Sequence, residues 1–351
     1  MHGYTKEGNT QRMRKHFVFM ILIILFSLLL IECFLRGVDP IGVKYFSEAS
    51  KYFSSMQQND TYAYIHKPYY KAKLEGVDVS INSQGFRGPE FDSGNASGKE
   101  RIIILGDSVV FGWGVPQGVI FPVRIQEILD PEKKNVEIVP IGVGSWNTRT
   151  EYEYLKSKGI SFHPDIIVLV IVHNDLEPKD RGHTDIRKDV LFGKDQRKGF
   201  PEILRNAWGW IVDTSYIAGY IQYFLEEKMV GARMTRVTKD SPEWQDVRLA
   251  LDEMVKLCRE NNVELVPYIY TSADQVTGNP IFNLYYEHLK ELGLRVFTLP
   301  DVLFVNRKYE NSIVDRHLNA DGQMIIAREM ARNLNDLLVA RHKMIISDHS
   351  K

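Results

Sequence analysis

Residues 101–108 read RIIILGDS, an apolar run that ends in a Gly-Asp-Ser turn. A short run of this kind, bounded by a charged residue and a turn, is typical of a strand buried on both faces of a parallel sheet. Together with four later runs it predicts five buried parallel strands. The later runs are Val136–Ile141, Ile166–Val172, Val263–Tyr270 and Arg295–Leu299.

Helical patterns lie between these strands, with apolar residues spaced as on one face of a helix. Strand and helix therefore alternate along the chain. This alternation favours an α/β fold with helices on both faces of a parallel sheet. The expected helices are Val119–Leu129, Thr148–Lys158, Trp244–Asn261, Ile281–Leu292 and Ala320–Val339.

One segment interrupts the alternation. Residues 176–241 are too long for a simple loop and contain a helical stretch near Trp208–Glu227, so we interpret them as an insertion over one edge of the fold. Three uses stay open for its aromatic residues: a packed helical face, a platform for sugars, or contact with a membrane interface. These residues are Trp208, Trp210, Tyr216, Tyr220, Tyr223 and Phe224.

The N-terminal region contains a long apolar run. Residues 17–35 read FVFMILIILFSLLLIECFL, with Glu32 as their single charge. A helix that crosses the hydrocarbon core needs roughly 20 apolar residues, and this run lacks the polar face of a core helix. Basic residues precede the run and acidic residues follow it, which predicts that residues 36–351 lie outside the cytoplasm. A cleaved signal peptide is the alternative, but IECFLRGVDP has no small-residue cleavage site, so we expect an uncleaved anchor.

These patterns predict how the chain is divided. Turn residues near Asn82–Gly85 and Arg87–Pro89 indicate one or two hairpins between the anchor and the α/β domain. The predicted parts are a cytoplasmic tail (1–16), a transmembrane helix (17–35), a juxtamembrane hairpin segment (36–98), an α/β domain (99–342) with an insertion at about 176–241, and a C-terminal tail (343–351).

Composition narrows the function classes. The formal net charge of the 351 residues is −1, which gives no reason to expect a nucleic-acid partner. The two cysteines, Cys33 and Cys258, lie in an apolar run and a helical pattern and are poor partners for a disulfide. His, Asp and Glu residues do not occur at metal-ligand spacing, so we expect neither a metal nor a cofactor.

Polar residues follow four of the expected elements, at the edge of an open α/β sheet where ligands bind. Gly106-Asp107-Ser108 follows the first strand, the turn at residues 142–145 (GVGS) the second, and His173-Asn174-Asp175 the third. The stretch DRHLNADG at 315–322 precedes the last helix. A hydroxyl, backbone donors, an amide and an imidazole at one rim are the set that acyl transfer needs.

These four blocks, in this order, resemble those of SGNH (GDSL-like) hydrolases. The stretch ILGDSVVFGWGV, the upstream INSQGFRG and the N-terminal anchor are similar to the membrane-bound bacterial branch of that family. The resemblance covers roughly Ile81 to the final helix. It implies a three-layer α/β/α sandwich with a five-stranded parallel sheet of flavodoxin-like order. It also implies a single-pass protein of the bacterial cytoplasmic membrane, with its catalytic domain on the periplasmic or extracellular side.

The resemblance also implies roles for individual residues. Ser108 matches the nucleophile, His317 the general base and Asp315 the acid that orients it. The oxyanion hole would combine the backbone N–H of Ser108 with a second N–H from Gly144 or Ser145. The side-chain amide of Asn174 would complete it.

Two departures from the family pattern keep alternatives open. The family commonly has Gly where Ser145 stands, which leaves the choice between Gly144 and Ser145 as donor. Its acid usually lies three residues before the histidine, where this chain has Val314, whereas Asp315 lies two before. Ser145 is a rival nucleophile without a G-x-S-x-G elbow, and His173 is read as structural or substrate-facing rather than as a second base.

The expected activity is that of a serine esterase working through an acyl-Ser108 intermediate. The family branch suggests O-acyl esters, such as acetyl esters, of envelope carbohydrate or glycolipid as partners. An O-acyltransferase with the same residues is one alternative, and a non-catalytic envelope scaffold is another. The sequence leaves the acyl group, the acceptor and the oligomeric state open.

Overall fold

The fold is described from a computed structural model. The residues described below are 4–95, 98–176, 202–234, 237–276, 278–305 and 307–348, and the expected insertion therefore lies partly outside them, at 177–201 and 235–236.

A five-stranded, all-parallel sheet forms the centre of the molecule, with the strand order β6-β5-β7-β8-β9. Successive side chains of the central strands point to opposite faces of the sheet. Both sets are buried, because helices cover both faces. The predicted α/β class and its five parallel strands are thus confirmed. The strands are β5 (Glu100–Gly106), β6 (Val136–Gly142), β7 (Ile166–Ile171), β8 (Glu264–Ile269) and β9 (Phe297–Thr298).

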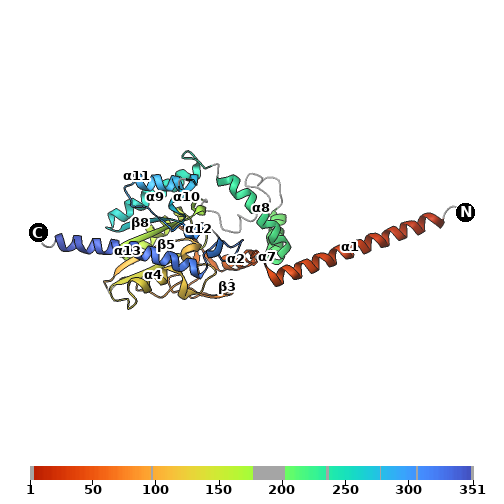
Figure 1. Ribbon diagram of the computed structural model, residues 1–351, viewed down its shortest axis with the longest axis horizontal. Helices are drawn as coiled ribbons and strands as arrows, with labels where there is room; N and C mark the ends of the chain where they lie inside the picture. Colours follow the sequence, from red (N-terminus) through yellow and green to blue (C-terminus); the bar gives the residue numbers. More distant parts are fainter. Residues whose placement is uncertain are drawn as a thin grey trace.

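Two hydrophobic clusters make the three layers. Ile102 and Ile104 of β5 pack on one face against α4 (Phe121–Leu129) and α13 (Ala320–Asp348). Ile103 and Leu105 point to the other face, where the covering helices are α5 (Thr148–Ser157), α9 (Pro242–Glu260) and α11 (Pro280–Glu291). Figure 1 shows these helices around the sheet. The shorter helices are α3 (Ser108–Phe111), η1 (Gln117–Val119), η2 (Gly159–Phe162), η3 (His173–Leu176), α10 (Ala273–Val276), α12 (Val302–Val305) and η5 (Arg307–Tyr309).

The segment between the anchor and the sheet belongs to the same core. It contains a helix and two antiparallel hairpins, and residues such as Tyr52, Tyr64 and Phe86 join the cluster that includes Ile103. The two hairpins turn at residues 60–62 and 75–76, whereas the predicted turn at Asn82–Gly85 closes only the isolated bridge between Ile81 and Arg87. The elements are α2 (Lys44–Ser54), β1 (Met56–Asn59), β2 (Ala63–His66), β3 (Lys71–Leu74) and β4 (Val77–Ser80).

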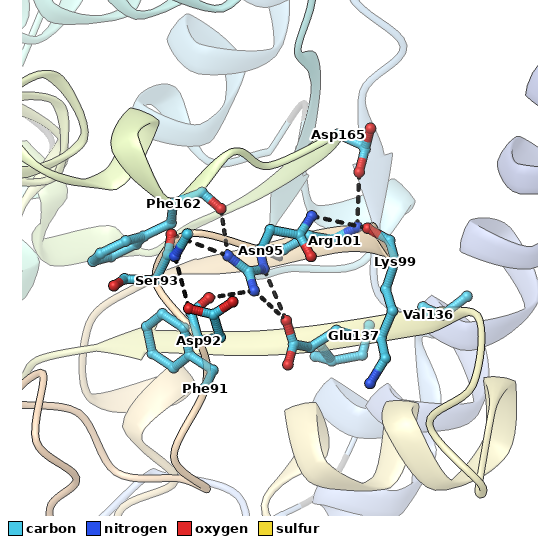
Figure 2. A network of polar contacts seen from close by, with 12 residues as sticks. Phe91, Asp92, Ser93, Asn95, Lys99, Arg101, Val136, Glu137, Phe162 and Asp165 are labelled. Carbon is cyan, nitrogen blue, oxygen red and sulfur yellow. Dashed lines mark hydrogen bonds and ion pairs between the residues drawn. The ribbon is translucent and has the colours of Figure 1, made fainter. Parts of the chain in front are cut away.

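A buried arginine fastens the start of β5. The Arg101 guanidinium donates to Glu137 Oε2 on β6 at 2.6 and 2.8 Å, and to the carbonyl oxygens of Asp92 and Phe162. Its backbone N–H donates to Asp165 Oδ2 at 2.8 Å. Figure 2 shows the guanidinium enclosed by these acceptors. A buried charge of this kind is tolerated because its donors are satisfied, and it fixes two strands and their flanking loops together.

The N-terminal helix α1 (Tyr4–Val38) extends away from the domain (Figure 1). Its segment Gln11–Val38 is long and apolar enough to cross a membrane, and none of its most apolar stretch is buried in the protein. It is therefore a candidate membrane span, as the sequence predicts.

A short, structured turn connects α1 to α2. Asp39 accepts hydrogen bonds from the backbone N–H groups of Gly42, Val43 and Lys44 at 2.8–3.2 Å, which fixes the start of α2. The carbonyl oxygen of Ile41 accepts the N–H of Val314 at 2.9 Å. The turn is thus hydrogen-bonded both to the start of α2 and to the loop that contains Val314.

The region near Trp208–Glu227 is helical as expected, but the helix is interrupted. The structure has two helices, α7 (Glu202–Thr214) and α8 (Tyr216–Met234), which break at Ser215. The break has a physical cause, since Glu32 of α1 accepts hydrogen bonds from Ser215 Oγ and from the backbone N–H groups of Tyr216 and Ile217. These contacts cap the start of α8.

Candidate active site

Ser108 stands at the carboxyl end of the central strand β5. It is the first residue of α3, and Asp107 before it caps the helix by accepting the N–H of Val109 at 2.9 Å. The helix ends after one turn at Gly112, whose φ of 73° is in the left-handed region. This tight strand–turn–helix places the Ser108 side chain at the edge of the sheet, half-buried.

His317 lies within hydrogen-bond distance of Ser108. Its Nε2 is 2.7 Å from Ser108 Oγ, and its Nδ1 is 2.5 Å from Asp315 Oδ1. Because a carboxylate only accepts, Nδ1 carries the proton, and the Ser108 hydroxyl can donate to Nε2. The same hydroxyl lies 3.2 Å from Asp107 Oδ2, a second acceptor. Ser108 is thereby joined in one hydrogen-bonded chain to His317 and Asp315, which lie more than 200 residues later in the sequence.

The spacing of two residues between Asp315 and His317 is accommodated by a turn. Asp315 Oδ1 accepts the backbone N–H of His317 at 3.1 Å as well as its imidazole N–H. A side chain that bonds its own backbone two residues on forms an Asx turn, which brings residues i and i+2 together. Asn311 donates to the other oxygen of Asp315 at 3.0 Å and to the Trp113 carbonyl at 3.1 Å. The sequence interpretation missed Asn311, since no pattern marks it.

Charge around His317 favours its protonated form. Burial lowers the pKa of His317, but the Asp315 carboxylate opposes this through its charge and its hydrogen bond, and the net pKa lies above the ordinary 6.5. Asp107 and Glu75 act in the same direction as Asp315. A raised pKa makes the imidazole a stronger base toward the Ser108 hydroxyl, provided that the pH is high enough to keep it neutral.

The turn after β6 lies next to that of Ser108. Gly142 pairs with Gly106 in the β5–β6 register, and the Val143 N–H donates to the Gly106 carbonyl at 3.3 Å. The Gly144 N–H donates to Tyr52 Oη at 2.7 Å. The Gly144 N–H is thus already engaged. The φ of Ser145, the alternative donor, is +59°, the left-handed conformation for which glycine is favoured.

Tyr52 belongs to a buried network that supports this turn. Its hydroxyl contacts His66 Nε2 at 2.7 Å, and His66 Nδ1 donates to the Gly85 carbonyl at 2.8 Å. Burial lowers the pKa of His66 to about 4, so the ring is neutral and accepts the Tyr52 proton. A Cβ at Gly144 would come within 2.6 Å of the Tyr52 ring, which explains the glycine there. The sequence interpretation missed Tyr52 and His66.

The turn after β7 carries the third block. Asp175 is buried and caps the strand end by accepting the Val172 N–H at 2.9 Å, a structural role. Asn174 lies in η3, but its side chain lies outside the described residues. His173 is exposed at the same turn.

The upstream motif INSQGFRG is also explained by packing. Arg87 is buried, and its guanidinium donates to the carbonyl oxygens of Gly112 and Val115 at 2.5 and 2.6 Å. It thus holds the loop that follows α3. The rings of Tyr45 and Trp113 flank His317, with centroids 6.1 and 6.2 Å from the imidazole. Among the residues that the structure describes, no group of three or more His, Cys, Asp or Glu side chains is arranged to hold a metal.

Comparison with known proteins gives matches among solved structures. No protein-family model and no curated protein matches the chain. Fifty chains of solved structures do. An esterase from Pseudoalteromonas is 13% identical, covering 68% of this chain and 99% of its own, with a TM-score of 0.41. A catalytic mutant of an acetylxylan esterase from Geobacillus stearothermophilus is 14% identical, covering 66% and 93%, with a TM-score of 0.38.

A member of the lipolytic G-D-S-L family from Veillonella parvula is 14% identical, covering 65% of this chain and 94% of its own, with a TM-score of 0.37. The described structure has the five-stranded parallel sheet and brings the serine and histidine blocks together. In both respects the chain agrees with the SGNH (GDSL-like) hydrolase family that its sequence resembles.

Proposed function

We propose that this protein is a serine ester hydrolase. The observation that carries the proposal is the hydrogen-bonded chain from Ser108 through His317 to Asp315, at the carboxyl end of the central strand. Ser108 Oγ attacks the acyl carbon while its proton passes to His317 Nε2, which then protonates the departing alcohol. A water then attacks the acyl-serine and gives a proton to the same nitrogen. As the acid leaves, His317 returns that proton to Ser108 Oγ.

The proposed oxyanion hole has three donors. The Ser108 N–H, at the first position of α3, has no partner within that helix. The Ser145 N–H comes from the adjacent turn, and the Asn174 amide from the turn after β7. Donors in such positions stabilise the charge that develops on the carbonyl oxygen in the transition state.

A fluorophosphonate probe tests this assignment. We expect the wild-type protein to be labelled, because such probes react with serines activated by a neighbouring base. Ser108→Ala should not be labelled, whereas Ser145→Ala serves as the matched control and should be. Labelling that disappears with Ser145→Ala and survives Ser108→Ala would make Ser145 the nucleophile, and an unlabelled wild-type protein would favour a non-catalytic scaffold.

We further propose that the ester is carried by envelope carbohydrate or glycolipid, an inference that depends on the location of the domain and on the family branch that the sequence resembles. O-acyl transfer uses the same residues, with a sugar hydroxyl in place of water in the second step. Analysis of the product, free acid or acylated sugar, distinguishes the two reactions.

The proposed location is the outer side of a bacterial cytoplasmic membrane. Lys6, Arg12, Arg14 and Lys15 precede the apolar run, and basic residues favour the cytoplasmic side. Alkaline phosphatase fused after Lys351 should therefore be active in intact cells. A fusion that is inactive, paired with a fluorescent cytoplasmic reporter at the same point, would reverse the orientation and remove the basis of the substrate proposal.

A further inference from the structure

The α7–α8 hairpin has an exposed apolar face. Trp210 on α7 is 68% exposed and Phe224 on α8 is 60% exposed. Ile203 lies seven residues before Trp210, two helical turns away on the same side of α7, and Ile221 lies three residues before Phe224 on α8. Both helices therefore present an apolar stripe outward.

Charged residues are sparse in the part of the hairpin that carries Trp210 and Phe224. Between Asn206 and Leu225 the sequence has one charged residue, Asp213. Its Oδ2 accepts a hydrogen bond from Ser50 Oγ on α2 at 2.7 Å, so it points into the protein rather than outward. A stretch of twenty residues, 206–225, with one inward-pointing charge differs from the mixed charged surface of an ordinary soluble domain.

The inner face of the hairpin is already used. Val212 of α7 and Ala218 of α8 form a cluster with Val43 and Phe46, and Val314 packs against it. Val314 directly precedes Asp315. The hairpin is therefore apolar on both sides, and only the inner side is covered by the described part of the chain.

The position of the hairpin indicates what covers the outer side. Glu32 of α1 caps the start of α8, with its carboxylate 2.9 and 3.1 Å from the N–H groups of Tyr216 and Ile217. Arg36 pairs with Glu32 at 2.7 Å and lies 5.0 Å over the Tyr216 ring. Figure 1 shows α7 and α8 at the end of the domain from which α1 leaves. The hairpin that carries the exposed face is thus bonded to the C-terminal end of α1, the candidate membrane span.

We propose that the α7–α8 hairpin lies in the interfacial layer of the lipid bilayer that α1 crosses, with Trp210 and Phe224 among the headgroups and upper acyl chains. This rests on the membrane anchoring proposed above. Aromatic side chains are favoured at this level, and a helix with an apolar outer face lies in the plane of the interface. Arg36, just after the apolar run, is at the level where a basic side chain meets lipid phosphates.

The consequence for the proposed reaction is a membrane-borne substrate. Val314 packs on the inner side of the hairpin, and the next residues along the chain are Asp315, Arg316 and His317. The loop that carries the proposed base is then one layer of helices from the lipid. Esters attached to glycolipids or lipid-linked sugars reach this level, whereas esters far out on a polymer do not.

Quenching of a fluorophore by spin-labelled lipid tests the hairpin. The full-length protein, with Cys33→Ser and the buried Cys258 retained, carries one new cysteine at Trp210 or Phe224 and is labelled with an environment-sensitive fluorophore. It is placed in nanodiscs of phosphatidylcholine and phosphatidylglycerol with a nitroxide near the headgroup. Phe34→Cys on α1 is the positive control. Ile128→Cys on α4 and Leu249→Cys on α9, 46% and 49% exposed, are the matched controls away from α1.

We expect quenching at positions 210 and 224 to approach that at position 34 and to exceed that at 128 and 249. Quenching at 34 alone, with 210 and 224 no different from 128 and 249, would overturn the hairpin proposal while leaving the anchor intact. That result would also mean that the exposed face of the α7–α8 hairpin is not covered by lipid. Absence of quenching at all five positions would overturn the anchor as well. Fluorophosphonate labelling of the same samples reports on Ser108 independently of either result.

Discussion

Replacing Ser108 or His317 with alanine should each reduce kcat on an aryl acetate by at least about 10⁴-fold, the loss typical of removing a nucleophile or its base. The double variant should be scarcely slower than either single one. The two residues act as a unit, since a hydrogen bond of 2.7 Å joins Ser108 Oγ to His317 Nε2. Removing either one therefore already removes the contribution of the other. Initial rates of 4-nitrophenyl acetate hydrolysis measure all three.

His173→Ala is the matched control for this pair. His173 lies exposed at the turn after β7 and is the alternative candidate for a base, so the His173→Ala variant should keep most of the activity. Losses that multiply in the double variant would mean that Ser108 and His317 act separately. A loss at His173 as large as that at His317 would contradict the assignment of the base.

Asp315→Asn should lower kcat by about 10²–10⁴-fold, since an amide can hold the imidazole in the wrong tautomer and cannot stabilise its cation. It should also move the acidic limb of the pH–rate profile. Burial lowers the pKa of His317 and the Asp315 charge raises it, so removing that charge lowers the pKa. Activity needs the neutral imidazole, and the variant should therefore keep its small residual activity down to a lower pH than the wild-type protein does.

Asp321→Asn provides the comparison for this change. Asp321 is exposed in the first turn of α13 and should affect neither the rate nor the pH profile. An intact rate in Asp315→Asn, with Ser108→Ala and His317→Ala inactive, would leave a Ser-His pair oriented by another group. A lower rate with an unmoved acidic limb would mean that Asp315 shapes the loop without acting on the imidazole.

The strands of the sheet could be predicted because parallel strands that are buried on both faces have continuous apolar sequences. RIIIL became β5, and its alternate residues pack against different helices on the two faces. The last run, Arg295–Leu299, was less well predicted, since only Phe297 and Thr298 pair with β8. Beyond Thr298 the chain leaves β8, and the Leu299 N–H donates to the Thr271 carbonyl.

The blocks of the site were predictable for a similar reason, because they follow strands whose ends meet at one edge. The supporting residues were not. Tyr52 reaches Gly144 across 92 positions of the chain, and nothing local marks a tyrosine that accepts a backbone N–H. The break between α7 and α8 is likewise decided from afar, since the capping carboxylate of Glu32 lies more than 180 residues earlier.

The turn at residues 39–43 limits how far this protein can reach. A flexible tether would let the domain explore a volume above the membrane, but here Asp39 fixes the start of α2 and Ile41 is bonded to Val314, next to the proposed acid. If α1 lies in the bilayer, the Ser108 hydroxyl is then held at a nearly constant distance from the membrane surface. If α1 crosses a membrane and the proposed esters are attached to it, their distance from the lipid would restrict which of them can reach Ser108.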